Sequence, residues 1–181
     1  ALPILNNMTK FGLRSIVYHE TVPGHHFHLA LQVENKDLPR FEQVRAFGGL
    51  SAITEGWGLY AERLAAESGW YDGDIEGQLG QLNYELFRAR RLVVDTGLHA
   101  KHWTRQQGID FGIEASEVER YTVFPGQACS YMIGELKLIE LREKARKLHI
   151  LLHRQYDVLV EFCVTQFEHG ARAFPPHGPQ L

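Results

Sequence analysis

The sequence predicts an all-α, or at least α-rich, fold. Alternating runs of Val, Ile and Thr, which are typical of half-buried strands, are scarce along the 181 residues. Apolar residues instead recur at spacings of three and four, as they do on one face of a helix. Short segments rich in Gly, Pro, Asn and Ser separate these stretches and predict turns.

Three helices are expected from apolar residues alone. The first stripe should face the core, and its members are Leu79, Leu82, Leu86, Ala89 and Val93. The second stripe repeats the pattern, with Lys and Arg between its members Leu138, Leu141, Ala145 and Leu148. The segment from Leu151 to Phe167 is more apolar and predicts a third, more buried helix.

Helix-breaking residues define the expected turns and the domain boundary. The turns are predicted at Asn35 to Pro39, Ser68 to Asp74, Gly108 to Ser116 and Pro125-Gly126. Three prolines after residue 173 predict an irregular end to the chain. We therefore expect a single helical, catalytic-type domain over residues 1–173 and an irregular C-terminal tail over residues 174–181.

Composition excludes several classes of protein. The chain is 44% hydrophobic and 23% charged, which is typical of a globular domain, and its net charge of -3 argues against a nucleic-acid partner. No apolar run approaches the roughly 20 residues of a membrane-spanning helix, and no signal peptide is expected within residues 1–181. Because the chain begins at Ala1, we expect a fragment of a longer protein, so its compartment and oligomeric state stay unassigned.

The densest chemical signal lies between Tyr18 and His26, where the sequence reads Tyr-His-Glu-Thr-Val-Pro-Gly-His-His. Many zinc hydrolases bind the metal through the two histidines of an H-E-x-x-H helix and activate water with the intervening Glu. Here Pro23 stands where the second histidine would be. His19 and Glu20 therefore begin a related, longer active-site helix motif, H-E-x-x-P-G-H.

His25 and His26 are the two candidates for the second histidine ligand. On a regular helix His25 lies about 240° around the axis from His19, and His26 lies about 10 Å along it. Neither shares a metal with His19 at about 2.0–2.1 Å unless the helix is distorted. Pro23-Gly24 predicts an opened turn, which favours His25 and leaves His26 as the alternative. Structural histidines beside a Pro-Gly turn would explain the same letters.

A third ligand is expected from the segment around Glu55 and Glu62. Zinc-binding helices of this kind commonly take a further ligand from a Glu on a later helix. The two glutamates are seven residues apart and share a helix face, and we expect Glu55 to bind the metal. The other interpretation is a solvated acidic face, which suits Glu62 better than Glu55. Glycines on both sides of Trp57 predict close packing against another helix or a ligand.

A polar stripe is predicted on the helix that contains the first apolar stripe. Its members are Arg88, Arg91, Asp95, His99 and His102. Such a stripe either lines a cleft or forms a ladder of surface ion pairs. In the first case we expect Asp95 to orient His99, and His99 to donate to a tetrahedral intermediate.

Residues 120–131 supply the remaining candidates. Tyr131 is a second candidate donor to an oxyanion, and the alternative is a role in the core. Arg91 and Arg120 are expected to bind a substrate carboxylate in the bidentate mode of a guanidinium.

Four of these segments resemble the motifs of one bacterial family, the domain of unknown function 885, which is considered related to the gluzincin metallopeptidases. The segments are His19 to His26, Glu55 to Glu62, Arg90 to Trp103 and Arg120 to Gly134. The resemblance extends from about Tyr18 to about His149. It implies a largely helical fold and a zinc-dependent, peptidase-like activity.

The same resemblance implies a role for individual residues. His19, His25 and Glu55 would bind zinc, and Glu20 would be the general base. Family members are generally longer, with a large helical region before the motif, so part of the substrate cleft is expected to lie outside this chain.

The sequence therefore predicts a zinc-dependent peptidase that hydrolyses peptide bonds with a metal-activated water. Zn²⁺ is the expected cofactor, although other divalent metals accept the same ligands. Two alternatives stay open. One is a non-catalytic metal-binding or scaffold domain of the same fold, and the other is a metal-dependent hydrolase of a non-peptide amide or ester.

Overall fold

The computed structural model describes residues 10–44 and 49–147, and within these ranges the chain forms helices and no strand. The all-α prediction is confirmed. The chain divides into two compact units, residues 1–140 and 141–181. All the residues of the candidate site belong to the first unit.

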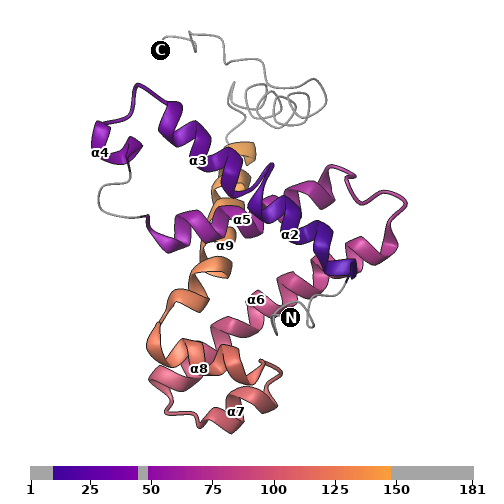
Figure 1. Ribbon diagram of the computed structural model, residues 1–181, viewed down its shortest axis with the longest axis vertical. Helices are drawn as coiled ribbons and strands as arrows, with labels where there is room; N and C mark the ends of the chain where they lie inside the picture. The colour runs from indigo at the N-terminus through magenta and orange to yellow at the C-terminus, as the bar shows by residue number, and fades with distance from the viewer. Residues whose placement is uncertain (1–9, 45–48, 148–181) are drawn as a thin grey trace, which may run out of the picture. The chain divides into compact units, whose positions relative to one another are not determined.

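The helices follow one another with short connections (Figure 1). Their bounds are η1 Lys10–Gly12, α2 Leu13–Glu20, α3 His25–Glu34, α4 Arg40–Gln43, α5 Ser51–Glu67, α6 Ile75–Ala100, α7 Arg105–Asp110, α8 Ala115–Val123 and α9 Gln127–Lys147. Three predicted turns, at residues 35–39, 68–74 and 125–126, separate consecutive helices as expected. The fourth begins later than predicted, because α7 continues to Asp110.

Side-chain caps explain where two helices begin. Asp74 precedes α6 and its carboxylate accepts a hydrogen bond from the backbone N–H of Gly77 at 2.9 Å. Thr104 and Gln107 form a reciprocal capping box at the start of α7. Both devices satisfy backbone donors that the first turn of a helix leaves without partners.

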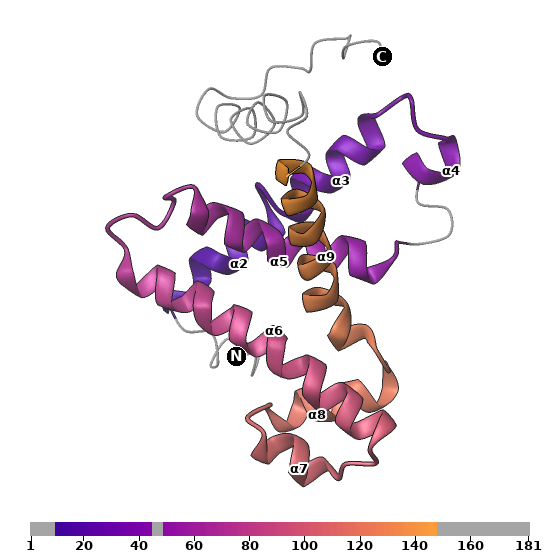
Figure 2. The same cartoon turned by 180° about the vertical axis from the view of Figure 1, so that it is seen from behind.

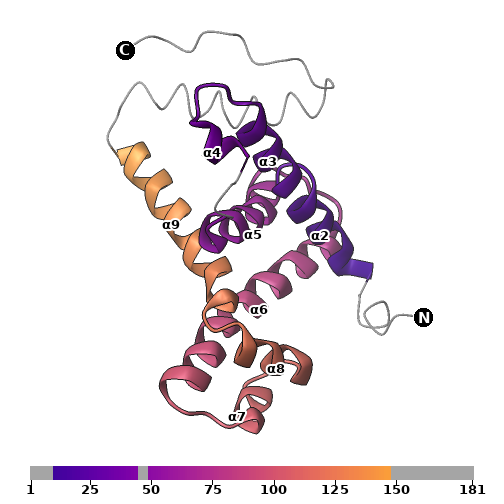
Figure 3. The same ribbon diagram turned by 60° about the vertical axis from the view of Figure 1, so that its left-hand side comes forward.

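Helix α5 is at the centre of the packing around the site. It contacts α2, α3 and α6, and its residues Leu59 and Ala61 are fully buried. Figure 3 shows α4 turned back beside α3, which it contacts. Figure 2 shows α6 extending beyond α2 and α5 to reach α7 and α8. A second core forms there from Val94, Ile113, Val118, Tyr121 and Ala128.

The predicted orientation of α6 is wrong. The stripe expected to face the core is largely exposed, with Leu79, Leu82, Leu86 and Val93 at 59%, 54%, 49% and 40%. The buried face of the helix is instead polar, and it includes Gln81, Arg88, Arg91 and Asp95. For Arg88 and Arg91 the reason is tertiary, because Glu62 and Glu117 of other helices compensate their burial. Asp95 accepts from the backbone N–H of Gly126 in the turn before α9, and Gln81 donates to Glu85 of α6 itself.

Some predictions fall on residues outside the described ranges. These are the helix from Leu151 to Phe167, the position of Leu148 and the irregular tail over residues 174–181. The single-domain boundary at residue 173 likewise stays a prediction. The helix predicted around Leu138 is α9. Among the described helices, none is both long enough and apolar enough to cross a membrane.

Candidate metal centre

We expected the H-E-x-x-P-G-H segment to form one distorted helix. It forms the end of one helix and the start of the next. Helix α2 ends at Glu20 and α3 begins at His25 (Figure 1). Pro23 has no N–H to continue α2, and the indole N–H of Trp57 donates to its carbonyl oxygen at 2.8 Å. This break lets His25 turn back towards His19, which a continuous helix would prevent.

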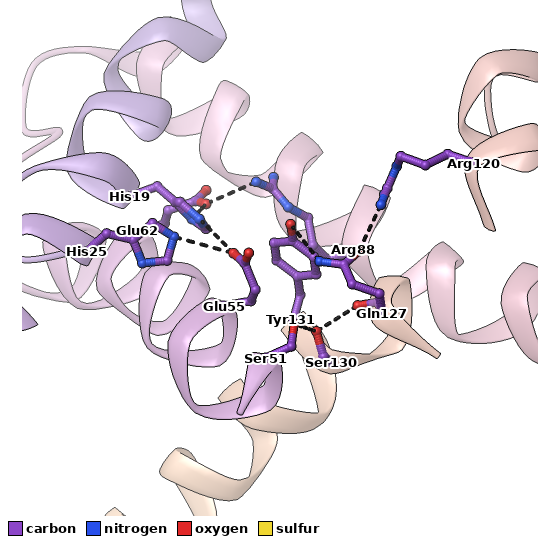
Figure 4. Close-up of polar contacts among 10 residues, drawn as sticks. All are labelled: His19, His25, Ser51, Glu55, Glu62, Arg88, Arg120, Gln127, Ser130 and Tyr131. Atoms are coloured by element: carbon purple, nitrogen blue, oxygen red, sulfur yellow. Dashed lines mark hydrogen bonds and ion pairs between the residues drawn. The ribbon is translucent and has the colours of Figure 1, made fainter. Parts of the chain in front are cut away.

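The break brings together three potential metal ligands. The rings of His19 and His25 are nearly perpendicular, at 82°, with centroids 4.6 Å apart. Oε2 of Glu55, from α5, lies 3.6 Å from Nε2 of His19 and 3.3 Å from Nε2 of His25 (Figure 4). One ligand atom from each residue lies within 4.8 Å of the other two, so a single cation has room between them. His26 is exposed and does not join this group.

The two glycines beside Trp57 explain how α5 comes so close. A Cβ on Gly58 would lie 2.6 Å from the His19 ring and 2.9 Å from the His25 ring. A Cβ on Gly56 would lie 2.5 Å from Cα of Gly134 in α9. Both distances are shorter than side chains tolerate. One glycine therefore leaves space for the imidazoles, and the other leaves space for a neighbouring helix.

Glu62 fixes the orientation of His19 from the other side of the ring. Its Oε1 lies 2.7 Å from Nδ1 of His19, and its Oε2 accepts a hydrogen bond from the Ser15 hydroxyl at 2.5 Å. Arg88 contributes an ion pair to Oε1 at 3.4 Å (Figure 4). With Nδ1 occupied in this way, Nε2 of His19 is the nitrogen that faces Glu55. Metal-binding histidines commonly have such a carboxylate on their second nitrogen.

The electrostatics of the three residues suit a cation. Burial by itself lowers the pKa of His19, but the carboxylates of Glu55 and Glu62 outweigh it and raise the pKa to about 8. Burial of Glu55 opposes its charge, but His19 and His25 outweigh this and lower its pKa to about 2. Positive charge is thus favoured between these side chains. Metal and protons compete for such ligands, because bound imidazole must be unprotonated.

A pocket of about 300 Å³ adjoins the three residues. Its lining consists of Ile16, His19, Glu20, His25, Glu55, Arg88, Arg91 and Tyr131. Three further predicted site residues, Glu20, Arg91 and Tyr131, therefore share a pocket with the potential ligands. The ring of Tyr131 lies 6.3 Å from the ring of His19.

The structure does not bring His99 to this pocket, which corrects its predicted role beside the metal. His99 lines a different pocket, with Trp103 and Val118 among its neighbours. It lies eleven residues beyond Arg88, or about 16 Å along α6. Asp95 does contact His99, as expected, with Nδ1 of His99 lying 2.8 Å from the Asp95 carbonyl oxygen and 3.3 Å from its carboxylate. That contact is made too far along the helix to serve the candidate metal centre.

Arg120 does not line the pocket either, but it supports residues that do. Its guanidinium donates to both oxygens of Glu117 at 3.1 and 2.9 Å, and to Oε1 of Gln127 at 2.8 Å. Glu117 also accepts from Arg91 at 2.7 Å, and Nε2 of Gln127 lies 3.5 Å from the Tyr131 hydroxyl (Figure 4). Arg120 is therefore a positioning residue rather than a direct substrate contact.

Two residues with clear roles in this geometry were not assigned from the sequence. Glu62 shares a helix face with Glu55, but the solvated face that the sequence favoured for it is wrong, because Glu62 is 0% exposed. Arg88 belongs to the predicted polar stripe, yet Arg91 and Arg120 were preferred for substrate binding. In both cases the spacing indicated the correct face, and only the neighbouring helices reveal the partner.

Most of the chain matches a protein family and a solved structure. Residues 1–158 match the family described as "Bacterial protein of unknown function (DUF885)". The chain is similar to a solved structure described as the "putative lipoprotein" from Colwellia psychrerythraea, with 41% identity and a TM-score of 0.73. That similarity covers 88% of this chain, which spans only 30% of the solved protein. No match is found among curated proteins.

Proposed function

This chain belongs to the bacterial DUF885 family of unknown function, and we propose that it contains the metal site of a zinc-dependent peptidase of the gluzincin kind. One observation carries the proposal: a ligand atom from each of His19, His25 and Glu55 lies within 4.8 Å of the other two. Two histidines and one glutamate are the zinc ligands of several peptidases. Gly58 leaves the space that both imidazoles occupy, which further supports a built site.

The residues of the pocket divide the chemistry between them. Zn²⁺ held by His19, His25 and Glu55 would acidify a bound water and polarise a carbonyl group. Glu20 accepts a proton from the attacking water and passes it to the leaving nitrogen as the C–N bond breaks. The Tyr131 hydroxyl donates to the oxygen that becomes negative during attack. His19 is held in place for this chemistry by Glu62 and Ser15.

Metal content is the first test of the proposal. The purified chain, supplied with zinc and then dialysed, should retain about one zinc per chain by elemental analysis. His19→Ala and His25→Ala should each lose it. His26→Ala is the matched control, because His26 is an exposed neighbour on α3 and its loss should leave the zinc in place. Absence of zinc from the unmodified chain, or equal loss in all three variants, would contradict the site.

Turnover separates a peptidase from the alternatives. Glu20→Gln should keep the zinc and lose hydrolysis of a peptide panel, with an expected decrease of at least about 10²-fold. A variant with normal hydrolysis would exclude Glu20 as the general base. Zinc without hydrolysis, in this chain and in a full-length protein that contains it, would favour a non-catalytic metal-binding domain. Hydrolysis of esters or non-peptide amides but not of peptides would favour the other alternative.

A further inference from the structure

Two arginines of α6 lie in the wall of the pocket beside the candidate metal centre. Arg88 and Arg91 are three residues apart, so they project from one side of the helix. They are only 8% and 7% exposed. A guanidinium stays charged in a protein and is almost never buried without an acidic partner. The acidic partners of Arg88 and Arg91 therefore show whether the chain itself compensates both positive charges.

Each arginine has one acidic partner, and it shares that partner with another basic side chain. Nη2 of Arg88 lies 3.4 Å from Glu62, the carboxylate that also holds His19. Nη2 of Arg91 lies 2.7 Å from Glu117, which also accepts from Arg120. Including Arg120, three guanidiniums share two carboxylates. Of the two other carboxylates in the pocket lining, Glu55 pairs with His19 and His25, and Glu20 has no ion pair with an arginine among the described residues.

The same two side chains retain unused hydrogen-bond donors. Nε and Nη1 of Arg88 and Nε of Arg91 have no acceptor among the described residues. Buried donors without an acceptor are costly, so an acceptor from outside the chain would be bound favourably. The Tyr131 ring lies 5.9 Å from Cζ of Arg88 and 4.7 Å from Cζ of Arg91, and so helps to hold both guanidiniums. A planar carboxylate supplies a negative charge and two acceptor oxygens together.

We propose that Arg88 and Arg91 bind the free α-carboxylate of a peptide, so that the site removes its C-terminal residue. The inference rests on the proposed function, because it places the scissile bond beside the candidate metal centre. The Tyr131 ring lies 6.3 Å from the His19 ring and within 5.9 Å of both guanidinium carbons. Both guanidiniums therefore lie at most about 12 Å from the His19 ring, a span that one extended residue of about 3.3–3.6 Å bridges together with a metal contact at one end and an arginine contact at the other. A pocket of about 300 Å³ is at the small end for ligand sites.

Binding of a matched pair of ligands tests the inference without requiring turnover. N-acetyl-Gly-Phe and its C-terminal amide differ only in the terminal carboxylate, and calorimetric titration of the zinc-supplied Glu20→Gln chain, which should hydrolyse neither ligand, gives a Kd for each. The free acid should bind at least about tenfold more tightly than the amide, as expected for a charged hydrogen-bonded pair. Arg91→Gln should reduce this preference to threefold or less. Arg90→Gln is the matched control, because it removes a positive charge from the same helix outside the pocket lining.

Further variants keep the test independent of folding. Arg88→Gln removes a partner of Glu62, the carboxylate that holds His19, so Arg91→Gln is the primary variant. Arg91→Lys, which keeps the charge, should retain part of the preference. Far-ultraviolet circular dichroism and zinc content should match the unmodified chain. Equal binding of acid and amide, or an undiminished preference in Arg91→Gln, would overturn the inference.

Two results separate this inference from the proposed peptidase activity, and a third separates it from binding of an acidic side chain. A preference for the free acid in a chain that binds no zinc would leave the carboxylate subsite standing and refute the zinc peptidase. Hydrolysis of acid and amide peptides at equal rates would support the peptidase and refute the carboxylate subsite. Equally tight binding of N-acetyl-Gly-Glu amide would assign the pair to an acidic side chain and overturn the C-terminal assignment.

Discussion

Nδ1 of His19 lies 2.7 Å from Oε1 of Glu62, and both side chains are buried. When His19 is neutral and Glu62 accepts its Nδ1 proton, Nε2 has a lone pair that faces Glu55 and His25. This contact joins α2 to α5 through two residues that are 43 positions apart in the chain. Ser15 and Arg88 complete the contacts of the Glu62 carboxylate.

Glu62→Gln should weaken zinc binding without abolishing it. The amide keeps the shape of the carboxylate but loses the charge that orients and polarises His19, and changes in a residue that holds a metal ligand cost about 10- to 100-fold in metal affinity. Competition with a zinc chelator measures the change in Kd. Glu67→Gln is the control, because Glu67 is a carboxylate on the exposed part of the same helix. An unchanged Kd in Glu62→Gln would show that the contact does not act on a metal ligand.

Gly58→Ala should abolish the site while preserving the helix. Alanine favours a helix by up to about 1 kcal/mol over glycine, so α5 itself should not suffer. The added Cβ would lie 2.6 Å from the His19 ring, and the rings must therefore move apart. Zinc content should fall below one tenth of the unmodified value, with unchanged helical circular dichroism. Ile53→Ala, an exposed change on the same helix, should retain zinc. Full zinc content in Gly58→Ala would show that a side chain at position 58 does not displace the imidazole rings.

Arg120→Gln should weaken carboxylate binding indirectly. Without Arg120, Glu117 pairs with Arg91 alone and compensates its charge more fully, so Arg91 attracts a ligand carboxylate less strongly. We expect the Kd for N-acetyl-Gly-Phe to rise roughly two- to fivefold, the scale of a partly exposed ion pair. Zinc content should not change. The control is Arg105→Gln, which removes the exposed Arg105–Glu119 pair and should leave this Kd unaltered.

Glu135→Gln should stabilise the protein more at pH 8 than at pH 5. Burial raises the pKa of Glu135 from 4.5 to about 7, so the folded chain holds a proton that the unfolded chain releases. The unmodified protein therefore loses stability as the pH rises from about 4.5 to 7, and glutamine avoids that loss. The variant should gain about 2 kcal/mol relative to the unmodified chain between pH 5 and pH 8.

Urea unfolding at the two pH values measures this difference in the free energy of unfolding. Glu140→Gln, an exposed change on the same helix, should show no comparable dependence on pH. A pH-independent effect of Glu135→Gln would mean that the folded carboxyl group titrates near its ordinary value.

Helices α6 and α9 and several turns could be predicted from local sequence, whereas α4, α7 and α8 had no predicted counterpart. Breakers at residues 35–39, 68–74 and 125–126 mark real turns, because proline and glycine act on the backbone where they stand. The side chains that meet at the candidate site were also identifiable, since the Pro23-Gly24 break favours His25 over His26 and the later helix offers Glu55. Their role as metal ligands stays a prediction until zinc is measured.

The orientation of α6 could not be predicted in the same way. Apolar residues at helical spacing identify a face but not its direction, and the leucine stripe from Leu79 to Leu86 was assigned to the wrong side. His99 and Arg91 belong to one polar stripe, yet the length of α6 separates them, so only Arg91 reaches the pocket.

The sequence by itself determined the helical class, the turns and the identity of the histidine and glutamate side chains that could bind a metal, because these depend on local backbone preferences and spacing. Tertiary structure alone decided that Glu62 is buried against His19 and that Arg88 faces the pocket. It also decided that the polar side of α6 is the inner one. Contacts between helices far apart in the chain compensate the burial of these charges, and no local pattern encodes which distant partner will do so.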